Sequence, residues 1–122
     1  MTSAESNSLG ATTSSASSSS DAKTITAQQR FRGALFGLAV ADAIGTTVEF
    51  QRAGSFTPLT DMVGGGKFRL ERGAFTDDTS MALCLAESLL ECGKHDPRDQ
   101  LQRHVRWYRH GHLSSNGECF DI

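Results

Sequence analysis

The sequence predicts an all-α fold in which a low-complexity tail precedes three helices. Apolar and small residues recur at helical spacing in three segments, and capping residues stand at the boundaries of these segments. No segment shows the clear alternation of apolar and polar residues that is typical of a strand. The chain has 122 residues, which is enough for one ordinary domain at most.

Residues 1–25 are rich in serine, threonine and alanine, and residues 17–20 are four consecutive serines. Such a segment has almost nothing to bury, so we expect a disordered tail. Residues 26–122 then form the folded part, expected to be a partial domain.

The first helix is expected from Thr26 to about Gly45. Phe31, Leu35 and Leu38 fall on one helical stripe, and glycines and alanines stand beside it. Each glycine weakens an isolated helix by about 1 kcal/mol, so this helix depends on tertiary packing. Small residues at this density also allow close approach by a neighbouring segment.

A long connection follows at residues 46–75, and a loop of that length is often functional. The second helix is expected from Asp77 to Glu91, with Gly93 as its stop. Its apolar residues predict a broad buried face that comprises Met81, Ala82, Leu85, Ala86, Leu89 and Leu90.

The third helix is expected to begin at Asp96 and Pro97, an N-cap residue followed by proline at the first helical position. It should end near Gly111, with Leu101, Val105 and Tyr108 on one face. Residues 113–122 are typical of a polar loop that leads into an apolar element.

Composition excludes several classes of protein. The net charge is −2 without a basic stripe, which disfavours nucleic acid as a partner. The N-terminus has no secretory leader pattern, and the longest apolar run, around residues 37–41, is too short to span a bilayer. Three cysteines without metal-ligand spacing are typical of reduced thiols. We therefore expect a cytoplasmic protein without membrane contact.

The most informative motif is the segment Thr76, Asp77, Asp78 and Thr79 at the start of the second helix. Its closely spaced hard oxygen donors suit Mg²⁺ or Mn²⁺. The same residues also suit a helix N-terminus, where Thr76 caps and the aspartates complement the helix dipole. Both interpretations remain open from this motif alone.

Other candidates are weaker. Residues 64–67, three glycines and a lysine, lack the frame of a phosphate loop, so we interpret the glycines as flexible. His110 and His112 have no third ligand for zinc at useful spacing. Cys119 has no base set by the sequence to make it a nucleophile. Asp42, near the end of the first helix, is expected to cap a helix or pair with a buried donor.

Four segments in order resemble the N-terminal part of the ADP-ribosylglycohydrolase family, nearest its dinitrogenase-reductase-activating branch. The segments are residues 33–50 (GALFGLAVADAIGTTVEF), 62–68 (MVGGGKF), 76–79 (TDDT) and 117–122 (GECFDI). The resemblance covers about residues 30–122. It implies the N-terminal portion of that family's helical fold.

The resemblance also implies a dinuclear Mg²⁺ or Mn²⁺ centre. Thr76, Asp77 and Asp78 match the family's metal ligands. Glu49 matches a glutamate at the metal site, as ligand or base, and Asp121 matches a catalytic carboxylate. The reaction implied is hydrolysis of the N-glycosidic bond between ADP-ribose and arginine, with ADP-ribosylated protein or ADP-ribosyl-arginine as substrate.

Two departures from the family pattern stand out. Ala41 replaces the usual glycine before Asp42, a change of one methyl group that affects packing more than chemistry. The family's second ligand set, an Asp-x-Asp-Thr motif far downstream, does not occur in these 122 residues. We therefore expect this chain, as an N-terminal part, to bind metal weakly and to be inactive or nearly so.

Two other functions compete with the hydrolase. The chain is alternatively a non-catalytic module that binds ADP-ribose or a partner protein. The third alternative is a helical bundle without a ligand, in which the aspartates only cap a helix.

Overall fold

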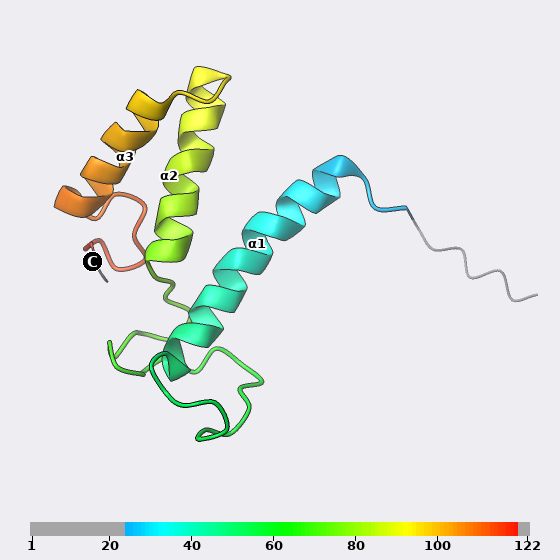
Figure 1. Ribbon diagram of the computed structural model, residues 1–122, viewed down its shortest axis with the longest axis vertical. Helices are drawn as coiled ribbons and strands as arrows, with labels where there is room; N and C mark the ends of the chain where they lie inside the picture. Colours follow the sequence, from blue (N-terminus) through cyan, green and yellow to red (C-terminus); the bar gives the residue numbers. More distant parts are fainter. Residues whose placement is uncertain (1–23, 120–122) are drawn as a thin grey trace, which may run out of the picture.

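The computed structural model describes residues 24–119 and confirms the all-α prediction (Figure 1). Its helices are α1 (Ala27–Gly45), the short 3₁₀ helix η1 (Thr46–Val48), α2 (Asp77–Cys92) and α3 (Pro97–His110). Within residues 24–119 the only extended pairing is an isolated antiparallel bridge between Gly65 and Leu70. The expected tail, except its last two residues, and Asp121 lie outside the described residues.

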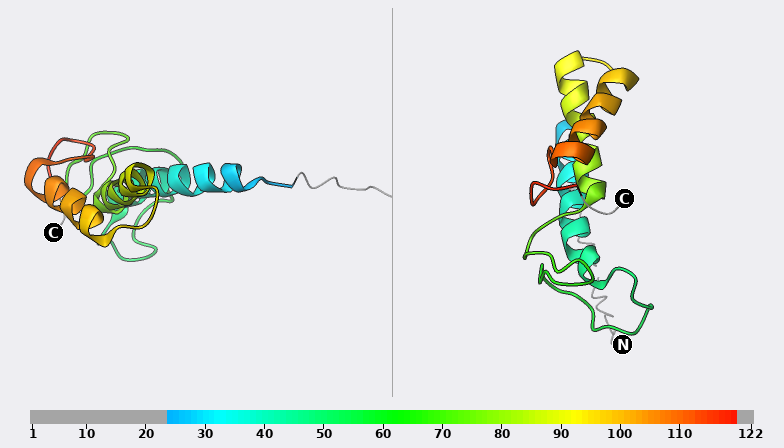
Figure 2. Two further views of the ribbon diagram at one scale, coloured as in Figure 1. Left: turned by 90° about the horizontal axis from the view of Figure 1, so that it is seen from above. Right: turned by 90° about the vertical axis from the view of Figure 1, so that its left-hand side faces the viewer.

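The helices form a hairpin and one diverging arm. Helices α2 and α3 lie side by side and antiparallel in every view (Figures 1 and 2). The C-terminal end of α1 lies near the start of α2, whereas its N-terminal half extends away from the hairpin. Every residue of α1 from 27 to 38 is exposed. The junction of α1 with α2 lies between the hairpin and the segment that connects η1 to α2 (Figure 1).

The predicted helix boundaries agree with the structure to within a residue or two because local chemistry sets them. Thr26 and Gln29 form a capping box at the start of α1. The Asp96 carboxylate accepts hydrogen bonds from two backbone N–H groups at the start of α3. Gly93 and Gly111 adopt left-handed conformations that end α2 and α3.

The predicted buried face of α2 is wrong. Met81 is 40% exposed, Leu89 42% and Leu90 84%. The buried side chains of α2 are instead small, namely Thr79, Ser80, Cys84 and Ser88. Ser80, Cys84 and Ser88 follow one another at four-residue spacing, so they form a small ridge that permits close helix packing.

The other two apolar stripes are also exposed. Phe31 is 77% exposed on α1. On α3, Leu101, Val105 and Tyr108 are exposed, and Arg103 and Trp107 are the buried residues. Hydrophobic spacing identified the helices correctly but not the faces that pack in the described part of the chain. An apolar groove of about 480 Å³ between α1 and α2 includes Phe31 and Leu90.

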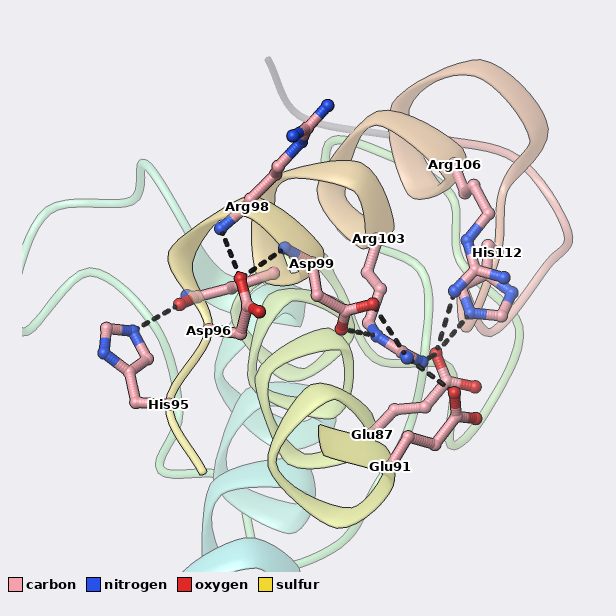
Figure 3. Close-up of polar contacts among 10 residues, drawn as sticks. Glu87, Glu91, His95, Asp96, Arg98, Asp99, Arg103, Arg106 and His112 are labelled. Atoms are coloured by element: carbon pink, nitrogen blue, oxygen red, sulfur yellow. Dashed lines mark hydrogen bonds and ion pairs between the residues drawn. The ribbon is translucent and has the colours of Figure 1, made fainter. Parts of the chain in front are cut away.

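An ion cluster centred on the buried Arg103 joins α2 to α3 (Figure 3). The Arg103 guanidinium, only 3% exposed as a residue, pairs with Glu87 at 2.5 Å, Glu91 at 2.7 Å and Asp99 at 2.5 Å. His112 Nε2 lies 2.8 Å from a Glu87 carboxylate oxygen. Three carboxylates around one guanidinium satisfy the charge that burial would otherwise penalise.

The glycines of the segment between η1 and α2 have a conformational role that the sequence analysis did not anticipate. Gly64, Gly65 and Gly66 all have positive φ angles, of 69°, 83° and 67°. A Cβ atom at Gly66 would lie 2.9 Å from the carbonyl oxygens of Thr46 and Thr47. Backbone conformation therefore favours glycine at all three positions, and close approach to η1 also requires it at Gly66.

Residues 27–48 form one continuous helical stretch whose length and composition also meet the criterion for a membrane span. The mean hydropathy of its most apolar window is 1.3, and 11% of that window is buried. Helices of soluble proteins and signal sequences meet the same criterion. The expectation of no membrane contact stays a prediction.

The Arg103 cluster makes stability depend on pH in the acid range. Hydrogen bonds from Arg103 lower the pKa of Asp99 from 3.8 to about 2. The unfolded chain therefore binds more protons between these values, and the stabilisation is lost as pH falls from about 4 to about 2. We expect the urea midpoint of unfolding, followed by circular dichroism, to fall over this range. Asp99→Asn should reduce that dependence, whereas Asp61→Asn, at an exposed ion pair, should retain it.

The groove between α1 and α2 should cause self-association, because exposed apolar surface favours contacts between molecules. Replacing Phe31 and Leu90 together with glutamine should shift sedimentation profiles towards monomer without loss of helix. Leu101→Gln, at an exposed site on α3, is the matched control. Equal effects of the two replacements would contradict a role for this groove.

Candidate metal and active site

A cavity of about 430 Å³ lies where the end of α1, η1 and the first turn of α2 meet. It brings together four of the five site residues predicted from the sequence, Glu49, Thr76, Asp77 and Asp78. The fifth, Asp121, is outside the described residues. The other lining residues are Leu38, Ala41, Asp42, Gly45 and Thr46.

The Asp42 carboxylate connects α1 to the first turn of α2. Its Oδ1 accepts a hydrogen bond from the Thr76 hydroxyl at 2.6 Å. Its Oδ2 accepts from the Thr79 hydroxyl at 2.6 Å and from the backbone N–H groups of Thr76 and Thr79 at 2.9 and 3.2 Å. These bonds span 34 to 37 residues of sequence. Asp42 therefore caps α2 from another helix, in agreement with its expected structural role.

The capping role predicted for Thr76 is wrong. Thr76 occupies the N-cap position, but its side chain makes no capping hydrogen bond, because its hydroxyl donates to Asp42. Thr76 is only 5% exposed, and its carbonyl oxygen accepts from the Ser80 hydroxyl at 2.8 Å. The capping interaction that we expected within α2 comes instead from α1.

Negative charge accumulates at this end of α2. Asp77 and Asp78 occupy the first turn, and Asp42 lies beside them in the same cavity. Burial, followed by the charges of Asp77 and Asp42, raises the pKa of Asp78 above its ordinary value. A divalent cation would relieve this repulsion.

The oxygen atoms that line this cavity are the kind of ligand that a hard cation prefers, but they do not form a complete binding site. The carboxylates of Asp77, Asp78 and Glu49 and the hydroxyl of Thr76 are oxygen donors on one cavity. Among residues 24–119, however, no three His, Cys, Asp or Glu side chains form a ready-made metal-binding group. The described residues therefore supply part of a cation site, and further ligands would be needed to complete it.

Sequence reasoning missed an aromatic and cationic cluster beside Glu49. Phe50 has a φ angle of 64°, a conformation that costs a non-glycine residue about 1–3 kcal/mol. The Lys67 ammonium lies 4.0 Å from the centre of the Phe50 ring, and Phe68 meets that ring edge-on at 6.0 Å. The residues are 17 or more positions apart, so no local pattern indicates the contact.

Comparison with known proteins identifies the relatives of this chain. The ADP-ribosylglycohydrolase family model matches residues 23–122. The chain is 59% identical over 91 residues to the ADP-ribosylarginine hydrolase Tri1 of Serratia proteamaculans (strain 568), which covers 75% of this chain and 25% of the relative. It is 38% identical over 94 residues to the ADP-ribosyl-[dinitrogen reductase] glycohydrolase of Rhodospirillum rubrum, covering 74% of this chain and 32% of the relative.

A solved structure agrees with these relatives. A chain of an ADP-ribosylglycohydrolase-related protein complex matches with a TM-score of 0.64 and 56% sequence identity. The match covers 67% of this chain and 29% of that chain. The sequence thus spans about a quarter to a third of the length of the proteins it matches. The family resemblance and the helical fold predicted from the sequence are confirmed.

Stability measurements should separate Asp42 from Asp77 and Asp78. Asp42→Ala leaves the buried N–H and hydroxyl donors of two threonines without an acceptor and should lower the free energy of unfolding by about 2–4 kcal/mol. Replacing Asp77 and Asp78 together with asparagine should change it by less than about 1 kcal/mol, because lost helix-dipole interactions oppose relieved repulsion. Denaturant unfolding measures both changes. Equal losses would contradict the separate structural role assigned to Asp42.

Proposed function

The chain belongs to the ADP-ribosylglycohydrolase family, and we propose from this membership that it carries part of the active site of a metal-dependent hydrolase. The proposed reaction removes ADP-ribose from modified arginine side chains of proteins. The name of the Serratia relative, an ADP-ribosylarginine hydrolase, supports arginine as the attachment site. The proposed cofactors are two divalent cations, Mg²⁺ or Mn²⁺.

This proposal rests on one observation: Glu49 and residues 76–78 line the same cavity. These residues are 27 or more positions apart in the sequence, and each matched a family site residue on sequence alone. Asp42 already caps α2, so capping does not require Glu49 in this cavity. The arrangement is expected, however, of a site that concentrates oxygen donors around a cation.

The side chains have separate roles in the proposed reaction. Thr76, Asp77 and Asp78 would hold the cations, which supply charge to orient the ribose hydroxyls and to acidify a water molecule. Glu49, half-buried at the same cavity, would accept a proton from that water. The water oxygen bonds to the anomeric carbon as the bond to the guanidinium nitrogen breaks, and the leaving nitrogen takes up a proton.

The incomplete set of ligands supports a second part of the proposal. Two aspartates and a threonine cannot fill the coordination spheres of two octahedral ions. We therefore propose that the 122-residue chain by itself binds Mn²⁺ weakly and releases little or no ADP-ribose. Asp121 stays a proposed catalytic carboxylate, and cytoplasmic location without nucleic-acid partners stays a prediction. The competing function is binding of ADP-ribose or a partner protein without catalysis.

A chimera tests whether this sequence can carry the site. The aligned 91-residue segment of the Serratia relative is replaced by the corresponding residues of this chain. We expect the chimera to release ADP-ribose from ADP-ribosylated arginine in the presence of Mg²⁺ or Mn²⁺. Replacing Asp77 and Asp78 with asparagine in the chimera should reduce the rate by at least about 100-fold, because the ligand charges are lost.

Asp96→Asn in the same chimera is the matched control, because it changes a capping aspartate on α3. It should leave the rate unchanged. A folded chimera that binds ADP-ribose without releasing it from arginine would refute the hydrolase and favour the binding module. Efficient metal-dependent release by the isolated chain would instead refute the expected inactivity.

A further inference from the structure

We propose that Asp42 is a positioning residue for the metal site, acting through the hydroxyl groups of Thr76 and Thr79. The proposal rests on the proposed function, because it assumes that Thr76 binds a cation. It assigns to Asp42 a role beyond that of a helix cap.

The hydrogen bonds of Asp42 leave little capacity for any other role. Its Oδ2 accepts three hydrogen bonds and its Oδ1 accepts the proton of the Thr76 hydroxyl. A carboxylate has about four lone-pair positions, two on each oxygen, so Oδ2 is fully used and Oδ1 keeps one. Asp42 Oδ2 therefore cannot bind a cation or accept a proton from water, although Asp42 lines the cavity.

The direction of the hydrogen bond between Thr76 and Asp42 leaves the lone pairs of the Thr76 hydroxyl oxygen available to a cation. A threonine hydroxyl has one proton, and that of Thr76 points to Asp42 Oδ1 at 2.6 Å. Any other polar group that contacts Thr76 Oγ1 must therefore approach its lone pairs, as a cation does. Hydrogen bonding to a carboxylate also makes the oxygen a stronger donor to a metal, the usual effect of partners behind metal ligands.

Thr79 holds the carboxylate in place. It is 1% exposed, and both its hydroxyl and its N–H donate to Asp42 Oδ2. With Oδ2 held in this way, Oδ1 is directed towards Thr76. The first turn of α2 and the end of α1 are thus held together at the two walls of one cavity.

Asp96 shows what a cap alone requires. Its carboxylate accepts only two backbone N–H groups, from Arg98 and Asp99, and no hydroxyl. Asp42 also accepts two backbone N–H groups but adds two hydroxyls, one of which belongs to a proposed ligand. The two hydrogen bonds from the Thr76 and Thr79 hydroxyls distinguish a positioning residue from a cap. Replacing a threonine side chain removes its hydroxyl bond and keeps the backbone N–H bond.

The test measures Mn²⁺ affinity of the 122-residue chain by electron paramagnetic resonance of free Mn²⁺, with folding followed by circular dichroism. We expect Asp42→Asn and Thr79→Val to weaken Mn²⁺ binding by about 10–100-fold in chains that remain folded. Thr79→Ser, which keeps the hydroxyl, should restore affinity to near the original value. Asp96→Ala, which removes the cap acceptor of α3, should lower stability without changing Mn²⁺ affinity.

The outcomes separate the positioning role from the proposed function. If Asp77→Asn with Asp78→Asn abolishes binding while folded Asp42→Asn and Thr79→Val chains bind normally, Asp42 is only a cap and the metal site stands. If the original chain shows no Mn²⁺ binding at millimolar concentration, both the metal ligands assigned to this chain and the positioning role are overturned. Activity of the chimera then decides independently whether the hydrolase assignment survives.

Discussion

The hydrogen bonding of the Asp42 carboxylate is the interaction on which the candidate site depends. A partly buried carboxylate needs hydrogen-bond donors to replace water. The first turn of a helix has backbone N–H groups that find no acceptor within the helix. Asp42 on α1 and the first turn of α2 satisfy these needs together. The contact also determines where the acidic residues of α2 lie relative to Glu49.

Local chemistry made the helix boundaries predictable. Capping side chains and left-handed glycines act within about four residues, so Thr26, Asp96, Gly93 and Gly111 could be interpreted without knowledge of the fold. The capping partner of α2 could not be identified in this way. It lies 34 residues upstream, and the sequence contains nearer threonine and aspartate residues with suitable chemistry.

Burial was harder to predict than helix formation. Periodicity identifies an apolar face, but the face that is buried depends on which segment packs against it. The small ridge of Ser80, Cys84 and Ser88 is buried, although these residues carry little hydrophobic signal. Arg103 is buried because Asp99, one turn away, and two glutamates of α2 neutralise it. That compensation depends on the pairing of two helices and is invisible in the composition of either one.

The two interpretations of residues 76–79 can now be weighed by charge. The N-terminus of a helix carries the equivalent of about half a positive charge, which one carboxylate already exceeds. Here Asp42 performs the capping, and Asp77 and Asp78 add two further carboxylates at the same terminus. Burial, followed by the charges of Asp77 and Asp42, raises the pKa of Asp78. Asp42 performs the capping, and Asp77 and Asp78 together carry more negative charge than the helix dipole can compensate, which supports the proposed cation.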